Sequence, residues 1–244
     1  MDSQSKIKKS GNSYILYDAE LITDPTVQLF DADYHTKQDD RQNNSTLSPG
    51  IGRARVVYFP LNGRAAVLKH YYRGGAVASI VKDRYLGFSI VKSRSFREWR
   101  LLKKMHEMNL PVPAPVAAHV KKGLLSYQAD LITIKIENSQ TLADALSQTV
   151  ISAKQWTGIG ACIKKFHRHD IYHADLNARN ILLTSSDDVY LIDFDNSGFR
   201  VHSESWKMAN LARLKRSLLK FKNNSVCNFE EENWNALVEG YKAG

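Results

Sequence analysis

The chain has 244 residues, of which 43% are hydrophobic, enough for one or two domains with a substantial core. Lys and Arg exceed Asp and Glu by 34 − 25 = +9, which favours anionic partners but also fits a solvated basic exterior. No apolar run suits a signal peptide or a membrane-spanning helix. Cys162 and Cys227 are too few for a disulfide framework and too far apart for a metal knuckle. We therefore expect a soluble cytoplasmic protein.

Short strands and turns are predicted at the start of the chain. Tyr14–Tyr17 predicts a first strand, and the polar stretch 36–46 predicts a loop. The runs Val56–Phe59 and Ala65–His70 predict two more strands, because Asn62-Gly63 between them is a strong signal for a two-residue hairpin turn. An antiparallel sheet is expected in this half of the chain.

Residues typical of a nucleotide phosphate site flank this hairpin. Gly50 and Gly52 would let backbone amides approach phosphates, although an ordinary turn explains two glycines almost as well. Lys69 ends an Ala-Val-Leu-Lys strand, similar to the Val-Ala-Ile-Lys strand whose lysine contacts phosphates and an acidic residue of the next helix. Glu98, in a helical pattern, is the predicted partner. A capping box with Ser95 is the competing explanation; we favour the ion pair because the lysine strand precedes the helix.

The middle of the chain completes the sheet and begins a helical region. Leu110–Pro115 contains three prolines and cannot continue a helix. Leu124–Gln128 and Asp130–Ile136 predict the last two strands of the sheet. Glu137–Ser139 is the predicted hinge, where backbone groups could meet the edge of an adenine ring. Beyond it, Ala153–His169 carries apolar residues at helical spacing and predicts a core helix.

The segment from His173 to Asp195 has the residues that a phosphoryl-transfer centre needs. Asp175 occupies the position of the Asp in the kinase loop His-Arg-Asp-Leu-x-x-x-Asn that accepts the substrate proton, and Asn180 that of the metal-binding Asn. Asp193 would be the second ligand of Mg²⁺, which prefers oxygen donors. Singly, these acids are typical of turns beside strands, but the joint pattern meets several constraints at once. His173 is given a supporting role.

Two short strands are predicted within this segment. Asn180–Leu183 and Val189–Ile192 flank a polar turn, so a hairpin would bring Asn180 and Asp193 side by side.

The order of these features predicts an α+β, two-lobed protein-kinase-like fold. Residues 1–137 would form a small antiparallel-sheet N-lobe with an N-terminal extension, carrying Lys69 and Glu98 for the nucleotide phosphates. Residues 138–244 would form a reduced helical C-lobe with the catalytic loop and the metal ligands.

Several stretches make the chain resemble the 3-deoxy-D-manno-octulosonic acid (Kdo) kinases of the bacterial lipopolysaccharide kinase family, over nearly its full length. These stretches, of which the last two are the most specific, are His70–Gly75, Asp83–Leu86, Leu110–Pro115, Tyr172–Asn177 and Asn210–Leu218. The resemblance implies ATP- and Mg²⁺-dependent phosphorylation of a Kdo hydroxyl, O-4, on a Kdo-lipid A precursor. It also implies a peripheral location on the anionic cytoplasmic face of the inner membrane. We expect no nucleic-acid partner, and no protein partner is inferred.

Departures from the protein-kinase pattern favour a small or lipid-linked acceptor. Ala174 replaces the usual Arg, Asp195 replaces the Gly of Asp-Phe-Gly, and no Ala-Pro-Glu follows. Asp195 could assist the metal or contact the substrate. Two alternatives remain: a lipopolysaccharide heptose kinase or other small-molecule phosphotransferase, and a basic binding module that keeps a kinase shape without turnover.

The stretch Trp206–Lys222 predicts an amphipathic helix. Its two sides carry four apolar and three basic residues, respectively Leu211, Leu214, Leu218 and Phe221, and Arg213, Arg216 and Lys220. The apolar side is expected to pack on the helical lobe. The basic side is either a solvated face or a contact with anionic lipid.

Overall fold

A computed structural model describes residues 5–36, 56–71, 85–86, 89–124, 126–224 and 227–244. The chain separates into two compact units, which are treated one at a time here. The sheet unit comprises Met1–Lys103 and Ala114–Lys135, and the helical unit comprises Lys104–Pro113 and Ile136–Gly244. Gly50 and Gly52 lie outside the described residues, as do parts of the stretches His70–Gly75 and Asp83–Leu86.

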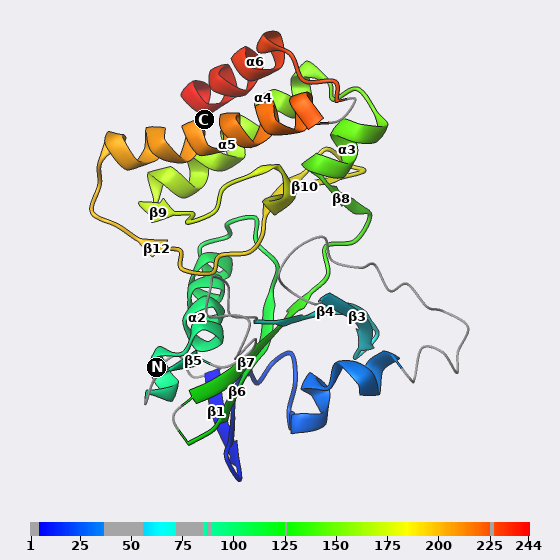
Figure 1. The fold of residues 1–244 in the computed structure, drawn as a ribbon, viewed down its shortest axis with the longest axis vertical. Helices are drawn as coiled ribbons and strands as arrows, with labels where there is room; N and C mark the ends of the chain where they lie inside the picture. The colour runs from blue at the N-terminus through cyan, green and yellow to red at the C-terminus, as the bar shows by residue number, and fades with distance from the viewer. Residues whose placement is uncertain (1–4, 37–55, 72–84, 87–88, 125, 225–226) are drawn as a thin grey trace. The chain divides into compact units, whose positions relative to one another are not determined.

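The sheet unit is built on antiparallel strands (Figure 1). Along the sheet the order is β1-β2-β6-β7-β4-β3, and β5 also pairs with β7. The strands are β1 (Ser5–Ser10), β2 (Ser13–Asp18), β3 (Val56–Leu61), β4 (Arg64–His70), β5 (Tyr85–Leu86), β6 (Pro115–Lys122) and β7 (Ser126–Ile134). Short 3-10 helices occupy Val27–Phe30 and Ile90–Lys92.

The predicted hairpin between β3 and β4 is confirmed. Asn62 and Gly63 both have positive φ, 50° and 76°, as a type I′ turn requires, and Leu61 pairs with Arg64 across them. This turn fixes the register that places Lys69 opposite Val56 of β3. The first predicted strand also forms, as β2.

The prediction for the last strands of this sheet was wrong. Leu124–Gln128 and Asp130–Ile136 are not two strands: Ser126–Ile134 is one strand, β7, and its partner β6 precedes it at Pro115–Lys122. The strand β6 was missed because it begins at the last proline of a proline-rich stretch and contains Ala117-Ala118, and alanine is depleted in strands. Complete burial on both faces compensates for this weak local preference, since Val116 to His119 are all buried.

Helix α2 (Arg94–Glu107) packs on this sheet through its part in the sheet unit. Phe96 and Trp99 are almost fully buried, and the Lys103 ammonium donates to the Asp18 carboxylate at 2.9 Å. Both members of this ion pair are buried, so removal of either would leave an uncompensated charge. The pair therefore fixes how the helix lies on β2.

A row of polar side chains crosses the sheet next to Lys69. His70, Asp130 and His119 are direct cross-strand neighbours on β4, β7 and β6. The Asp130 carboxylate contacts His70 Nδ1 at 2.5 Å and His119 Nδ1 at 2.9 Å, and His119 Nε2 lies 3.0 Å from the Ser13 hydroxyl. Burial alone would raise the pKa of Asp130, but the hydrogen bonds and charges of the two histidines lower it below its usual range. This row ties four strands together.

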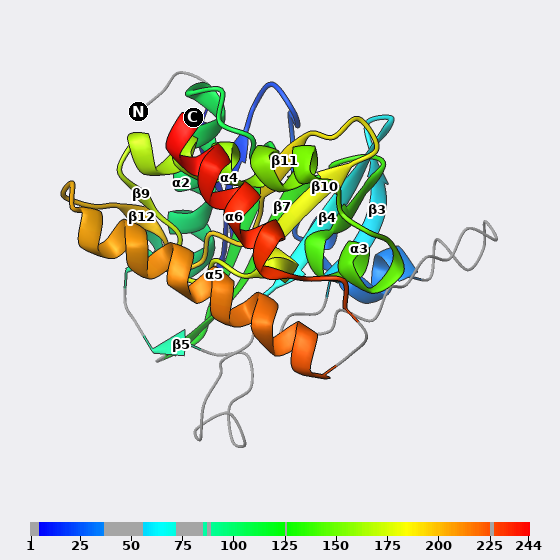
Figure 2. The ribbon, with the colours of Figure 1, turned by 90° about the horizontal axis from the view of Figure 1, so that it is seen from above.

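The described residues of the helical unit form the end of α2, further helices and several short strands (Figures 1 and 2). The further helices are α3 (Leu142–Gln148), α4 (Ala153–Arg168), α5 (Glu204–Asn224) and α6 (Glu231–Ala243), with a 3-10 turn at Ala178–Asn180. Its strands are β8 (Ser139–Thr141), β9 (Ile171–Tyr172), β10 (Ile181–Thr184), β11 (Val189–Leu191) and β12 (Gly198–Phe199). They form two small sheets, ordered β11-β10-β8 and β12-β9.

Helix α4 is the core of this unit, as its apolar spacing predicts. Trp156, Ile159, Ile163 and Phe166 are all buried, and a capping box between Ser152 and Gln155 starts the helix. Helix α6 lies beside α4 in both views. Among the described residues, no helix has the length and apolar character needed to cross a membrane.

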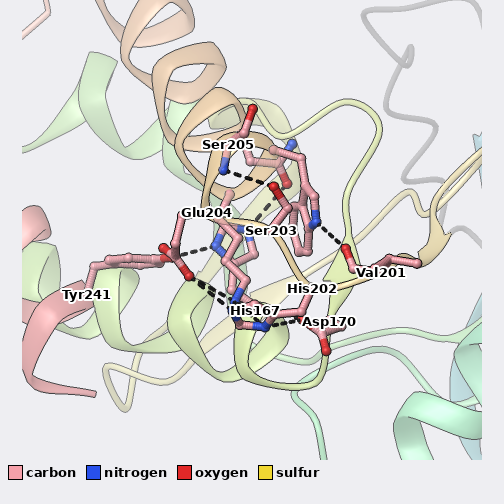
Figure 3. Close-up of polar contacts among 11 residues, drawn as sticks. His167, Asp170, Val201, His202, Ser203, Glu204, Ser205 and Tyr241 are labelled. Carbon is pink, nitrogen blue, oxygen red and sulfur yellow. Dashed lines mark hydrogen bonds and ion pairs between the residues drawn. The ribbon is translucent and has the colours of Figure 1, made fainter.

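A buried polar network joins the end of α4 to α5 and α6 (Figure 3). His167 Nδ1 accepts from the Tyr241 hydroxyl at 2.8 Å, and Nε2 faces Asn210 Oδ1 at 3.4 Å. Nearby, the buried Lys207 ammonium donates to Glu204 at 3.2 Å and lies 3.8 Å from Asp170. Burial lowers the pKa of His167 to about 4, so this ring is neutral near pH 7.

The close approach of α4 and α6 gives a first prediction. A Cβ at Gly240 would collide with the Thr157 carbonyl group, and one at Gly160 with the Leu237 carbonyl. Backbone cannot yield as a side chain can, so we expect Gly240→Ala to lower the free energy of unfolding by at least ~1–3 kcal/mol. Gly158→Ala, whose Cβ would make only ordinary van der Waals contact, should instead be neutral or stabilise by ~0.5–1 kcal/mol. Denaturant unfolding measures the free energy of unfolding of both variants. Equal changes for Gly240→Ala and Gly158→Ala would contradict the close approach of α4 and α6.

His167 gives a second prediction, on the pH dependence of stability. Between pH 6.5 and about pH 4 the unfolded chain binds a proton at His167 that the folded chain does not bind. The contribution of neutral His167 to the free energy of unfolding is therefore fully present above pH 6.5. It falls as the pH decreases through this window and levels off below about pH 4. It amounts to about 3 kcal/mol at most.

Denaturant titrations from pH 4 to pH 8 measure this effect. His167→Gln, which carries no titrating group, should flatten the curve between pH 6.5 and 4 relative to the parent. Parallel curves for parent and variant would show that His167 does not carry the effect.

Candidate functional site

In the sheet unit, the predicted ion pair between Lys69 and Glu98 is present. The Lys69 ammonium lies 3.0 Å from Glu98 Oε2 and 3.1 Å from Oε1. Ser95 lies inside helix α2, and its hydroxyl donates to the His119 carbonyl at 2.9 Å. The ion pair, rather than the competing capping box, is thus the contact made by Glu98.

The Tyr71 hydroxyl also contacts the Glu98 carboxylate, and the sequence did not predict this contact. This hydroxyl donates to Glu98 Oε2 at 2.5 Å, and the ring centroid of Tyr71 lies 4.6 Å from the Lys69 ammonium. The Glu98 side chain is 3% exposed, so its charge requires such partners. Only the family-like stretch that begins at His70 gave a signal for Tyr71.

In the helical unit, His173 braces the loop that carries Asp175. His173 Nε2 donates to the Ile192 carbonyl at 2.9 Å, while Nδ1 accepts from the Asp175 backbone N–H at 3.1 Å. A single neutral tautomer of the ring satisfies both contacts. The ring also packs on Phe194, with centroids 4.7 Å apart. One side chain therefore fixes the Asp175 backbone to the strand that leads into Asp193.

The predicted hairpin of β10 and β11 also forms and brings Asn180 next to the Asp193 segment. The Ile192 N–H donates to the Asn180 carbonyl at 3.0 Å. Asp193 itself adopts φ 62°, the left-handed region that Asp tolerates better than most residues. Phe194 is buried against Phe166, which anchors the turn.

The Asp175 carbonyl is held from two sides. It accepts hydrogen bonds from the side-chain amides of Asn177 and Asn180, both at 2.9 Å. The backbone is therefore fixed while the Asp175 side chain remains 57% exposed. The arrangement suits a carboxylate that must meet a substrate hydroxyl.

Helix α5 supports this loop with a stripe of residues on one face. Asn210 donates to the His173 carbonyl at 2.9 Å and accepts from the His173 N–H at 3.3 Å, while the Ser217 hydroxyl accepts from the Ala178 N–H at 3.3 Å. Between them, Arg213 Nη1 donates to Asp175 Oδ1 at 2.7 Å. These positions recur at i, i+3 and i+7, so they share a face of the helix. The sequence predicted the apolar side of α5, with Leu211, Leu214 and Leu218 buried, but not this polar stripe.

Asn180 and Asp193 carry side-chain oxygen atoms of the kind that Mg²⁺ prefers. Because the Asn180 nitrogen binds the Asp175 carbonyl, its oxygen is the end left for a cation. Among the described residues no group of three or more His, Cys, Asp or Glu could hold a metal. Mg²⁺ does not need such a group, since one or two protein ligands commonly share it with substrate phosphates and water.

Comparison with known proteins agrees with the resemblance of the sequence. Three relatives named 3-deoxy-D-manno-octulosonic acid kinase match almost the whole chain. The protein of Mannheimia succiniciproducens is 43% identical over 238 residues, 95% of this chain and 97% of the relative. That of Vibrio vulnificus (strain CMCP6) is 36% identical over 233 residues, 96% of each chain. That of Haemophilus influenzae (strain Rd) is 37% identical over 239 residues, 94% of this chain and 96% of the relative.

A family model agrees with these relatives. The model described as the lipopolysaccharide kinase (Kdo/WaaP) family matches residues 49–241, a range that contains all the predicted site residues from Gly50 to Asp193. The chain therefore belongs to the lipopolysaccharide kinase (Kdo/WaaP) family and is a kinase.

Proposed function

We propose that the protein transfers the γ-phosphoryl group of ATP to O-4 of Kdo on a Kdo-lipid A precursor. The observation that carries this proposal is the Asp175 loop, in which a fixed backbone presents an exposed carboxylate beside Asn180. The relatives of closely similar length named as Kdo kinases support the choice of acceptor.

In this proposal the two units correspond to the lobes of a protein-kinase-like fold, with the main division near residue 137 and the segment Lys104–Pro113 added to the helical unit. Residues 1–137 supply Lys69, which neutralises the nucleotide phosphates and is oriented by Glu98. Gly50 and Gly52 are proposed to bring backbone amides to the same phosphates. The ion pair within the sheet unit supports this assignment, because a buried carboxylate on α2 holds the lysine in one orientation.

Residues 138–244 supply the proposed base and the proposed ligands of Mg²⁺. Asp175 accepts the proton that leaves the acceptor hydroxyl as oxygen attacks phosphorus. Asn180 and Asp193 would hold Mg²⁺, which neutralises charge on the transferred phosphoryl group when bound. His173 keeps the Asp175 backbone in register with the Asp193 turn and does not itself touch the substrate.

We also propose that the protein acts peripherally on the cytoplasmic side of the inner membrane. The exposed face of α5 supports this location: Met208 and Leu219 are 45% and 41% exposed, and Arg216 and Lys220 are exposed beside them. Apolar side chains flanked by cations suit a surface of anionic lipid.

Mass spectrometry tests the proposed reaction directly. A Kdo-lipid A precursor incubated with the protein and Mg-ATP should gain the mass of one phosphoryl group, and fragmentation should locate it on O-4 of Kdo. A product phosphorylated on another sugar, with Kdo unchanged, would refute the assignment. Phosphorylation of a heptose-bearing acceptor in its place would favour the alternative heptose kinase.

A third prediction concerns the proposed base. Asp175→Asn removes the proton acceptor but keeps the size of the side chain, so we expect transfer to fall ~10²- to 10⁴-fold. Binding of ATP, measured by calorimetry, should remain close to that of the parent. Turnover near the parental rate would remove Asp175 from the mechanism.

A fourth prediction concerns the proposed metal ligands. Asp193→Ala removes a charged ligand and Asn180→Ala a neutral one, so Asp193→Ala should weaken Mg-ATP binding more severely. Even changes around a metal site commonly cost ~10- to 100-fold in affinity, so a loss of at least ~10-fold is expected for Asp193→Ala. Asp188→Ala, in the exposed turn of the same hairpin, is the matched control. Unchanged Mg-ATP affinity in Asp193→Ala would exclude it as a ligand.

A further inference from the structure

The contact between Arg213 and Asp175 differs from the other contacts of the α5 stripe. Asn210 and Ser217 bind backbone atoms of the loop, whereas Arg213 binds the carboxylate that is proposed to act on the acceptor. The loop is already held by Asn210, Ser217 and His173. The arginine is therefore not required to position the backbone.

The pair also contributes little to stability. The side chains of Arg213 and Asp175 are 46% and 57% exposed, and ion pairs with such exposure contribute little net stability. The buried neighbours Leu214 and Leu218 hold helix α5 in place, and so they fix the backbone position of Arg213. Its side chain stays about half exposed to solvent. An exposed pair of this kind can accept a further anion at low cost.

Arg213 retains unused hydrogen-bond donors. A guanidinium has five N–H groups in a rigid planar fork that matches a carboxylate. Within the described part of the chain, Arg213 makes one polar contact, through Nη1 to Asp175 Oδ1. Its remaining donors are available for an anionic group that arrives beside Asp175.

The proposed acceptor creates the need for such a group. Kdo is a sugar acid, with its carboxylate on C2, two ring bonds from C4. When O-4 approaches Asp175, two carboxylates of like charge come close together, which disfavours binding unless a cation lies between them. Arg213 provides a cation in direct contact with the Asp175 carboxylate.

We infer that Arg213 forms a carboxylate subsite: it binds the carboxylate of the sugar acid while it contacts Asp175, and so selects an anionic sugar over a neutral one. This inference rests on the proposed function. It makes Arg213 a specificity-determining residue rather than the proton acceptor.

A cycle of two acceptors and two proteins tests the inference. The acceptors are the Kdo-lipid A precursor and the same molecule with the Kdo carboxylate converted to its methyl ester, which leaves the lipid phosphates unchanged. With the parent, esterification should raise KM roughly 10- to 100-fold, the loss expected for one charged hydrogen-bonded contact. Arg213→Gln should show a similar increase with the native acceptor and little further increase with the ester.

Two further variants sharpen the result. Arg213→Lys keeps the charge but loses the planar fork, so it should recover part of the discrimination between acid and ester. Arg168→Gln removes an exposed arginine at the end of α4, outside the α5 stripe, and should discriminate as the parent does. If Arg213 only supported the fold or Asp175, its substitution would impair both acceptors equally, and such additive losses would overturn the inference.

Binding separates failure of the inference from failure of the proposed function. Calorimetric titration of each acceptor into the parent without ATP should show weaker binding of the ester, whether or not transfer follows. If the parent binds acid and ester equally, the carboxylate subsite is refuted. If it prefers the acid through Arg213 but transfers no phosphoryl group, the subsite stands and the proposed reaction is refuted.

Discussion

The geometry of the candidate site depends on the two hydrogen bonds of the His173 ring. The ring joins the Asp175 N–H to the Ile192 carbonyl, and these two residues are seventeen positions apart in sequence, 192 − 175. Protonation of the ring would turn the acceptor Nδ1 into a donor and break the contact with the Asp175 N–H. The buried ring also packs against Phe194, so its orientation is held by packing as well as by the two hydrogen bonds.

The sheet unit holds its two buried carboxylates by the same physical means. In the sheet unit, Glu98 is buried and receives Lys69 and Tyr71, and Asp130 is buried between two histidines. In each case a buried carboxylate is fully supplied with donors, which makes its orientation unique, because an unpaired donor or charge there would be costly. Asp175 is the contrast: its backbone is fixed but its carboxylate is exposed, as its proposed role of proton acceptor requires.

The contacts that the sequence predicted are those with a local signal. Asn62-Gly63 determined one hairpin, the polar turn before Val189 determined another, and the strand ending at Lys69 indicated Glu98. The strand β6 and the role of Asn210 had no such signal. Alanines in β6 are stabilised by neighbouring strands on both sides, and Asn210 meets His173 across 37 positions of chain, where helix periodicity carries no information about the partner. Tertiary packing, rather than local sequence, determines both the strand β6 and the contact of Asn210 with His173.

Helix α5 orders the Asp175 loop along much of its length. Its apolar face, through Leu214 and Leu218, packs in the helical unit, and the adjoining stripe follows the loop in the same direction. Asn210 meets residue 173, Arg213 residue 175 and Ser217 residue 178, so each turn of the helix advances along the loop. Substitution of one stripe residue therefore acts at one point of the loop. The same periodicity places the one charged member of the stripe at the Asp175 carboxylate, where a charge has chemical rather than structural consequences.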